Sequence, residues 1–501
     1  MDAKKAVENV TSLGYILDEG AFNFLKMIEN DEKFSQIMNN IIQEINQLSP
    51  KPLILSKETF QKILEKYSLN KEIDIDSSRR IFRPLAAEYE SDLEIISDPT
   101  ESISTVGTIE DFYQYFCNRF EKMSRILTER TDVKDAGTLK NALRASQNTV
   151  NKFIAMITEK REKKGRLFLF VEDLEETATI LVPETLLHNY PSTLYLTLDQ
   201  VVCFEAVKGR KDFFIARNII FPDVPERRIQ ENNNPLSALL IADIHFGSKT
   251  FLDKIFNKMI FWLNGKIGSQ KQIEKASAIK YLIIAGDLVD GVGIYPNQEK
   301  ELLVPDIYQQ YRSVAQYLEQ IPEYIEVIIV PGNHDAASQA LPQPAISREY
   351  AKPIYEARNI VSLGNPSEIK LGGRTFLIYH GNNLVDIAST IPNVNVDQPQ
   401  KGVEHLLKIR HLAPEFGAKT PISPEPHDLL VIERAPDVFQ TGHLHTEGHL
   451  FYRGTQIVCC GAWQSQTSYQ KSLGITPTVG SVSIINLNNV NLSMLNFIEN
   501  V

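Results

Sequence analysis

The sequence has little cysteine, no long apolar run and no excess of positive charge, and each absence excludes a class of protein. The four cysteines, at positions 117, 203, 459 and 460, are too few and too scattered for a disulfide framework, which favours a reducing compartment. No apolar run approaches the roughly 20 residues that cross a bilayer. The N-terminus, Met1-Asp-Ala-Lys-Lys, lacks the apolar core of a secretory signal. We therefore expect a soluble cytoplasmic protein.

The net charge of −11 argues against a nonspecific nucleic-acid coat, because such proteins need excess Lys and Arg to displace phosphate counterions. It does not exclude a nucleic-acid enzyme, since metal ligands are often carboxylates and bound cations reverse the sign of an acidic cleft. The 501 residues, 43% hydrophobic and 23% charged, have a globular composition and exceed what one compact core holds. Two or three domains are expected.

The beginning of the chain is interpreted as a small helical domain, residues 1–70, followed by a linker, residues 71–104. Apolar residues recur at helix spacing over Phe34–Ile45, and Ser56 is a candidate N-cap for a second helix that reaches Tyr67. Periodicity alone does not distinguish a core face from a partner-binding face. Mixed charges with Ser and Pro predict the linker.

A barrel domain with a leading helix is predicted for residues 105–228. The helix is expected over Ile109–Met123, and the segments after it alternate with period two between turn signals such as Lys164-Gly165. Several short strands predict a small antiparallel barrel, with the OB-fold a candidate on size. The expected strands are Phe153–Ile157, Leu167–Glu172, Thr177–Val182, Leu194–Leu198, Val201–Ala206 and Phe213–Ile220. The basic segment Lys160–Arg166 fits either a solvated hairpin tip or a phosphate-contacting loop.

The remaining residues, 235–501, alternate apolar strands with helical patterns such as Ile307–Leu318, which predicts an α/β layered domain. Strands are expected at Ala238–Ile241, Tyr281–Ala285, Val327–Val330, Phe376–Tyr379 and Val438–Thr441. Each strand is followed by polar residues that can bind metals: Asp243 and His245, then Asp287 and Asp290, then Asn333, His334 and Asp335, then His380, and then His443 and His445. Ligand sites form beyond the carboxyl ends of strands, so we expect these clusters to converge on one crevice.

The residue types in these clusters favour a metal site over a packing role. Five of the ten histidines lie in them, which chance placement in a core does not explain. Residues i and i+2 of an extended segment point to the same side, so Asp243 with His245, and His443 with His445, can each present two donors. Imidazole mixed with carboxylate suits Mn²⁺, Fe²⁺ or Zn²⁺, whereas Ca²⁺ takes oxygen ligands. No cysteine belongs to the set, which disfavours a structural zinc site.

The series D-x-H, G-D-x-x-D-G, G-N-H-D, H-G and G-H-x-H resembles the calcineurin-like metallophosphoesterases, which include DNA-repair nucleases. The chain is still more similar to the small subunits of archaeal family-D DNA polymerases. This likeness covers roughly residues 150–480 and is carried by DGVGIYPNQ, DIYQQY, PGNHDA followed by PQPA, GNPSE, RHLAP, TPISPE, TGHLH and GAWQSQT. It implies an α/β fold: a two-layered metallophosphoesterase β-sandwich flanked by helices, preceded by an OB-like β-barrel and a small helical domain.

The resemblance also implies two divalent transition-metal ions, with Mn²⁺ expected and Fe²⁺ or Zn²⁺ as alternatives. Seven side chains would hold them: Asp243, His245 and His445 on the first ion, Asp287 between the two, and Asn333, His380 and His443 on the second.

Two further residues would be catalytic. His334 would protonate the leaving oxygen or stabilise the charged transition state, and Asp290 would orient its other nitrogen. The alternative for Asp290 is a simple turn carboxylate, and Asp335 is expected to cap the turn.

The implied function is that of a proofreading 3′–5′ exonuclease subunit of a two-subunit archaeal replicative DNA polymerase, acting at the nucleoid. Two ions would acidify a water for in-line attack on a DNA phosphodiester, with no covalent intermediate. The partners would be the large catalytic subunit, since the sequence has no apparent polymerase site of its own, and single-stranded or mismatched DNA 3′ ends. Every ligand position is filled, which favours an active nuclease over a non-catalytic assembly subunit. A stand-alone phosphoesterase is a third hypothesis.

Several other residues attract attention without a firm role. The histidines between and beside the motifs, His188, His405, His411, His427 and His449, are expected at the surface or in packing. Tyr295 could stack on a terminal base or simply pack. The segment from Trp463 to Gln466 carries part of the family resemblance but suggests no mechanism.

Overall fold

The computed structural model describes residues 82–164, 166–189, 195–472 and 474–498, and a few positions between residues 7 and 55. The chain divides into two compact units, residues 1–81 and 82–501. In the first unit β1 (Ile16–Leu17) and β2 (Ile54–Leu55) pair in parallel, which the helical periodicity does not predict. The helices predicted at Phe34–Ile45 and Ser56–Tyr67 lie outside the described residues.

Part of the predicted linker is folded into the second unit. After η1 (Leu85–Glu88), β3 (Leu93–Ser97) pairs with β13 (Ser367–Leu371) at the edge of a six-stranded sheet. The linker prediction is therefore wrong for these residues. An edge strand keeps much of its surface in water, so its sequence stays charged and looks like a loop.

The barrel is closed by five strands in the order β4-β5-β6-β8-β7. They are β4 (Val150–Lys163), β5 (Arg166–Glu172), β6 (Thr177–Val182), β7 (Val201–Lys208) and β8 (Phe213–Ile220). Phe153, Phe204 and Phe214 meet inside the barrel. The predicted strand Leu194–Leu198 is wrong, since residues 195–198 form no strand. The short helices are η2 (Thr100–Ser102), α6 (Leu139–Arg144) and α7 (Glu184–Asn189).

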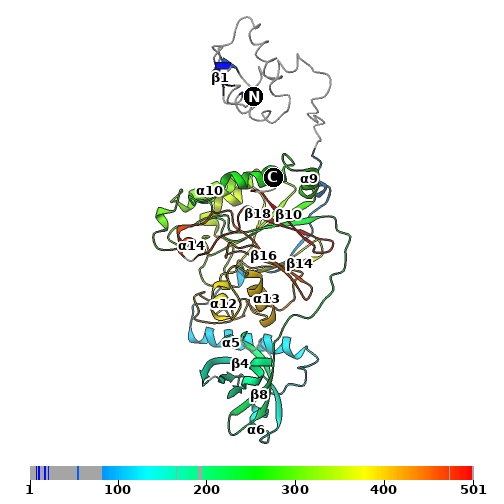
Figure 1. The fold of residues 1–501 in the computed structure, drawn as a ribbon, viewed down its shortest axis with the longest axis vertical. Helices are drawn as coiled ribbons and strands as arrows, with labels where there is room; N and C mark the ends of the chain where they lie inside the picture. The colour runs from blue at the N-terminus through cyan, green and yellow to red at the C-terminus, as the bar shows by residue number, and fades with distance from the viewer. Residues whose placement is uncertain are drawn as a thin grey trace. The chain divides into compact units, whose positions relative to one another are not determined.

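The helix α5 (Ile109–Thr128) begins at a capping box made by Thr108 and Asp111. One face packs on the barrel through Met123 and Leu127, and Tyr115 belongs to the core beneath the neighbouring sheet. The helix therefore joins the barrel to the rest of the second unit (Figure 1).

Two six-stranded sheets make up the larger part of this unit, and residues such as Leu240, Ile283, Phe376 and Val458 fill the core between them. The first sheet has the order β12-β11-β10-β9-β18-β19, and the second has β16-β17-β15-β14-β13-β3. The remaining strands are β9 (Ser237–Ile241), β10 (Ile279–Ala285), β11 (Glu326–Val330), β12 (Ile360–Ser362), β14 (Arg374–Ile378), β15 (Val438–Thr441), β16 (Gly448–Tyr452), β17 (Thr455–Cys459), β18 (Ser481–Asn486) and β19 (Leu492–Asn496).

Helices cover both outer faces. The first sheet is covered by α8 (Asp253–Leu263), α9 (Gln270–Ser277), α10 (Ile307–Leu318) and α11 (Arg348–Ala357), and the second by α12 (Leu384–Thr390) and α13 (Pro399–Ile409) (Figure 1). The short η4 (Gln298–Lys300) and α14 (Ser468–Ser472) lie in loops. No described helix is long and apolar enough to span a membrane. The fold is thus mixed α/β with a five-stranded barrel.

Parallel pairing brings the ends of the predicted strands together. Ile241 of β9 pairs with Ile284 of β10, and Ala285 pairs with Val330 of β11. In the second sheet β14 and β15 are also parallel. The structure contains all five strands that the sequence predicts to precede the polar clusters. The clusters therefore lie at the carboxyl ends of these strands, at matching edges of the two sheets.

Candidate metal centre

The polar clusters converge in the structure as the sequence predicts. Five of their residues have left-handed backbone conformations, with φ from 51° to 70°: Asp243, His245, Asp287, His443 and His445. Such conformations are uncommon for residues with a side chain, and they concentrate at sites whose surroundings hold them for function. The turns after β9, β10 and β15 therefore aim these side chains at a shared point.

One group of donors comprises Asp243, His245 and His445, all buried, whose ligand atoms lie within 4.8 Å of one another. The Nε2 atoms of His245 and His445 are 3.0 Å apart, and His445 Nε2 is 3.7 Å from Asp243 Oδ1. A second group comprises Asp287, His380 and His443 under the same limit. A third overlapping group joins His245, Asp287 and His334.

Asp287 lies between the two main groups. Its Oδ2 atom is 3.7 Å from His245 Nε2 and 3.3 Å from His380 Nε2, while Oδ1 accepts a hydrogen bond from the His334 backbone N–H at 2.9 Å. Gly332 makes room for this carboxylate, because a Cβ at that position would collide with it. One oxygen atom thus faces an imidazole nitrogen of each group.

His380 reveals what the second group lacks. Its Nδ1 donates to the backbone carbonyl of Ala285 at 2.8 Å, which leaves a lone pair on Nε2 in the neutral ring. That nitrogen faces Asp287 Oδ2, Asn333 Oδ1 at 3.2 Å and His443 Nδ1 at 3.3 Å. Burial lowers the pKa of His380, but the charge of Asp287 outweighs it and raises the pKa to about 9. A positive charge among these atoms is therefore stabilised by the Asp287 carboxylate.

The remaining pKa values follow from burial and charge. Burial raises the pKa of Asp243 to about 7. Burial would also raise the pKa of Asp287, but His380 and His334 hold it well below its usual value. Burial, aided by the charge of His380, lowers the pKa of His443 to about 3. A neutral imidazole is the form that ligates metals, so this donor set of nitrogen and oxygen atoms fits divalent cations.

The predicted role of Asp290 needs correction. Its carboxylate does not orient His334; Oδ1 instead accepts from His245 Nδ1 at 3.1 Å. His334 Nδ1 donates to the backbone carbonyl of Asp290 at 2.7 Å. The side chain turns inward to one imidazole while the carbonyl faces the other, a division that sequence spacing cannot reveal. Asp335 caps the turn, since Oδ2 accepts from the backbone N–H groups of Gly332 and Leu288.

Three glutamines to which the sequence reasoning gave no role support the site. Gln298 donates to the Asp290 carbonyl at 2.7 Å, and Gln464 donates to the Asp290 carboxylate at 2.9 Å. The Gln470 amide lies 2.8 Å from His445 Nδ1. Gln464 stands in the GAWQSQT segment, which carried a resemblance but no mechanism, and only the fold brings it to Asp290.

Other histidines lie away from the centre. His405 and His411 are buried, and His427 and His449 are exposed; none of the four belongs to a candidate metal group among the described residues. The backbone at His188 lies in α7, and its side chain is outside the described residues.

The centre opens into a cavity of about 580 Å³ whose lining includes Asp287, His334, Tyr295, Tyr469 and Lys419.

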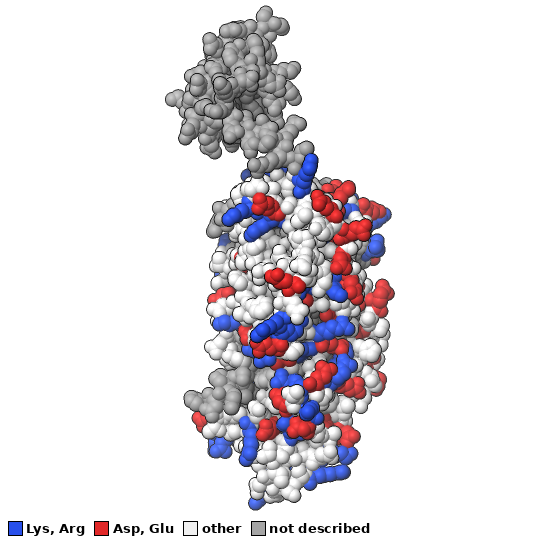
Figure 2. Space-filling view, turned by 90° about the vertical axis from the view of Figure 1, so that its right-hand side faces the viewer, with Lys and Arg blue, Asp and Glu red and all other residues white. Residues whose placement is uncertain are grey.

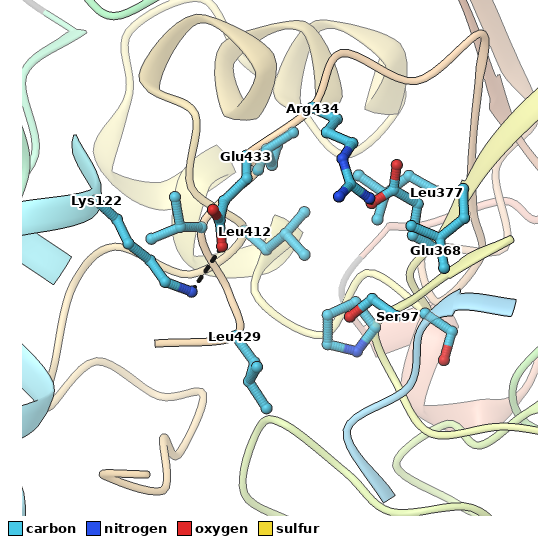
Figure 3. A pocket seen from close by; sticks show the side chains of 13 residues that line it. Ser97, Lys122, Glu368, Leu377, Leu412, Leu429, Glu433 and Arg434 are labelled. Carbon is cyan, nitrogen blue, oxygen red and sulfur yellow. Dashed lines mark ion pairs between the residues drawn. The ribbon is translucent and has the colours of Figure 1, made fainter. Parts of the chain in front are cut away.

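A separate cavity of about 250 Å³ has none of the predicted site residues in its lining. There Lys122 reaches from α5 to Glu433, 2.7 Å away, and Arg434 faces Glu368 (Figure 3). On the described part of the face in Figure 2, positive and negative side chains are interspersed. The larger cavity is therefore the candidate site.

Comparisons with known proteins show sequence similarity to subunits of DNA polymerases. Residues 238–448 match the family model for the B-subunits of DNA polymerases alpha and epsilon. The DNA polymerase II small subunit of Pyrococcus horikoshii is 38% identical over 447 residues, which are 87% of this chain and 72% of that protein. That of Methanothermobacter thermautotrophicus is 36% identical over 481 residues, 94% of this chain and 96% of that protein. Zinc-bound Vps29 of Entamoeba histolytica covers 52% of this chain and 90% of Vps29 at 13% identity, with a TM-score of 0.26 that carries no argument.

The match to the family model covers less than half of the chain, whereas the two archaeal matches extend over most of it and show a subunit of a DNA polymerase. More particularly, the extent and identity of the two archaeal matches show that it belongs to the family of DNA polymerase II small subunits, the small subunits of archaeal family-D DNA polymerase.

Proposed function

We propose that this chain is the proofreading 3′–5′ exonuclease subunit of a two-subunit archaeal replicative polymerase and hydrolyses DNA phosphodiesters with two divalent transition-metal ions. The observation that carries the proposal is the sharing of Asp287 Oδ2 between two imidazole–carboxylate groups at the base of a cavity. Two such groups around one carboxylate suit a two-metal phosphoesterase. The paired sheets with flanking helices support the metallophosphoesterase sandwich, and the barrel's strand order supports the OB-like fold.

The residues divide into two ion-binding sets. Asp243, His245 and His445 would hold one ion, and Asn333, His380 and His443 the other, with Asp287 shared. When bound, the ions supply positive charge that stabilises the phosphoryl transition state and acidifies an attacking water. Mn²⁺ is the expected metal, with Fe²⁺ or Zn²⁺ as alternatives.

His334 would act on the leaving oxygen. Because Nδ1 is fixed by the Asp290 carbonyl, the other nitrogen, Nε2, is the one available to a substrate in the cavity. A protonated His334 would donate there to the departing 3′ oxygen. The Asp290 carboxylate fixes the ring of His245 and is thereby a positioning group for a ligand.

The partner expected for a small subunit is the large catalytic subunit, in which DNA synthesis would take place, and the second ligand is a DNA 3′ end. The assembly would work at the nucleoid. The description of this chain's relatives as small subunits of a DNA polymerase supports the two-subunit arrangement.

The test uses the purified full chain with Mn²⁺ and a single-stranded oligonucleotide labelled at its 5′ end. Stepwise shortening from the 3′ end is expected, and it should vanish in Asp287→Ala prepared in parallel, which excludes a contaminating nuclease. A metal-loaded wild-type protein that cuts no DNA would favour the assembly subunit. Turnover of nitrophenyl phosphate without DNA cleavage would favour a phosphoesterase of small substrates.

A further inference from the structure

One wall of the cavity is aromatic. Tyr295 lies in the loop after β10 and Tyr469 in α14, and their ring centroids are 6.1 Å apart with the planes 25° from parallel. The Tyr295 ring centroid is also 6.3 Å from that of His334. A stack of two aromatic rings therefore begins beside the proposed general acid and ends at Tyr469, which is 59% exposed.

No hydrogen bond within the described residues explains the position of these two rings. No hydrogen bond is recorded for either hydroxyl group within the described part of the chain, and α14 has only five residues. Ile294 and Ile475 line the same cavity beside them. A pair of one half-buried and one exposed aromatic ring with an apolar border is typical of a surface that receives another flat, apolar group.

The lining of the cavity also includes one positively charged side chain. Lys419 is the single Lys or Arg among the described residues that line it, it is exposed, and it has no recorded ion pair with another described residue. Asp287 and Asp290 line the same cavity and would repel the backbone of a nucleic acid in the absence of ions. Lys419 is thus placed to attract a phosphate on the approach to the site.

We infer that the Tyr295–Tyr469 wall stacks on the terminal base of an unpaired DNA 3′ end while Lys419 contacts a backbone phosphate. The inference rests on the proposed exonuclease function and names its specificity element. A base lies one sugar away from its phosphate, so a phosphate at the metal groups brings the base beside His334 and onto Tyr295. A cavity of about 580 Å³ has the size of a small-ligand site, too small for a duplex end. Stacking serves every base, so little sequence preference is expected.

The kinetic test compares Tyr295→Ala and Tyr469→Ala with wild type on two single strands, one with an ordinary 3′ nucleotide and one with an abasic 3′ residue. On the ordinary strand each variant should raise KM by about 5- to 100-fold, the range for losing a stacked base. On the abasic strand the variants and wild type should have the same KM, because no base is present to stack. Phe at either position should restore wild-type behaviour.

The chain offers a matched control. Tyr308 stacks on Tyr350 with ring centroids 5.5 Å apart and the same 25° angle, is 44% exposed, and does not line the cavity. Tyr308→Ala should leave both KM values unchanged. Lys419→Ala should raise KM on both strands and reduce the salt dependence of binding by about one phosphate contact.

A spectroscopic measurement avoids reliance on turnover. In the His334→Ala background, which is expected to keep its ions, a strand with 2-aminopurine at its 3′ terminus should change fluorescence on binding as the base stacks. Adding Tyr295→Ala and Tyr469→Ala should abolish that change. Tyrosine variants that match wild type on the ordinary strand, or that lose equally on both strands, would overturn the inference. Wild-type protein that neither binds nor cuts any 3′ end would instead overturn the proposed function.

Discussion

Two buried clusters of charged side chains in the second unit differ in how completely their donors and acceptors are paired with one another. One is the candidate metal centre, and the other is the network around Arg119, in which the guanidinium contacts Asp428 at 2.7 Å and the Tyr115 hydroxyl at 2.7 Å. Arg119 also donates to the Pro414 carbonyl at 2.6 Å, and His411 Nε2 lies 2.8 Å from Asp428. The charged side chains Arg119 and Asp428 in one cluster, and Asp243 and Asp287 in the other, are buried, and an unpaired buried charge is costly.

In the Arg119 network each donor faces an acceptor. Asp428 accepts from Arg119 and His411 and, through Oδ1, from the Leu430 backbone, and these partners hold its pKa well below the usual value despite burial. In the candidate metal centre His380 Nε2 faces Asp287 Oδ2, Asn333 Oδ1 and His443 Nδ1, and the only positive charge among these atoms is the proton whose pKa the charge of Asp287 raises to about 9. The Arg119 network needs no further component, whereas in the candidate metal centre a metal ion could take the place of the proton on His380.

The largest expected effect is a loss of bound metal, which should follow a substitution in the candidate metal centre but not one in the Arg119 network. Asp287→Ala removes the carboxylate shared by both donor groups, so bound metal should fall from two ions to fewer than one per chain. Exonuclease activity should fall by roughly three orders of magnitude or more. Metal analysis after gel filtration and 3′-end degradation measure the two quantities. Arg119→Met should keep both ions, and a similar metal loss there would erase the contrast.

His334→Ala tests chemistry inside the metal centre without emptying it. Loss of a general acid should lower the rate by about two to four orders of magnitude while both ions remain. Single-turnover cleavage together with metal analysis provides the measurement. Equal loss of metal would show that His334 is a ligand and that its assigned role is wrong.

The Arg119 network should matter for stability instead. Arg119→Ala leaves the Asp428 carboxylate buried without its main partner and should cost about 3–5 kcal/mol of unfolding free energy. Urea unfolding measures this. Arg125→Ala is the matched control, since Arg125 stands on the same helix and pairs with Glu433 but is 60% exposed, so its loss should cost at most about 1 kcal/mol. Equal costs would mean that burial of the network contributes nothing.

A smaller effect comes from a buried histidine outside both clusters. Burial, aided by the charges of Lys408 and Lys160, lowers the pKa of His405 to about 3, and its Nε2 has no recorded partner in the described structure. The unfolded chain binds this proton near pH 6.5. The contribution of His405 to the free energy of unfolding is therefore fully present above pH 6.5 and is lost as the pH falls toward 3. At pH 5 the loss is about 2 kcal/mol.

His405→Leu should remove that part of the pH dependence. The difference in unfolding free energy between pH 7.5 and pH 5 should shrink by about 2 kcal/mol relative to wild type. The site histidines titrate equally in both proteins and cancel in the comparison. An unchanged difference would show that His405 is protonated at pH 5 in the folded protein.

Sequence reasoning predicted the convergence of the polar clusters better than it predicted the fold around them. The strands before Asp243, Asp287 and His380 each contain a continuous, buried apolar run, Ala238–Ile241, Tyr281–Ala285 and Phe376–Ile378, and such runs stand out in a sequence. The edge strand β3 and the outer strands β16 and β19 are partly exposed and carry no such signal. The Arg119 network was missed altogether, since it joins side chains 309 positions apart that form no motif.

Anomalous scattering from crystals of protein purified without chelators and grown with Mn²⁺ is the most direct check on the metal centre. Two peaks are predicted, one among Asp243, His245 and His445 and one among Asn333, His380 and His443, with Asp287 touching both. A single peak, or none at these side chains, would contradict the two-ion site.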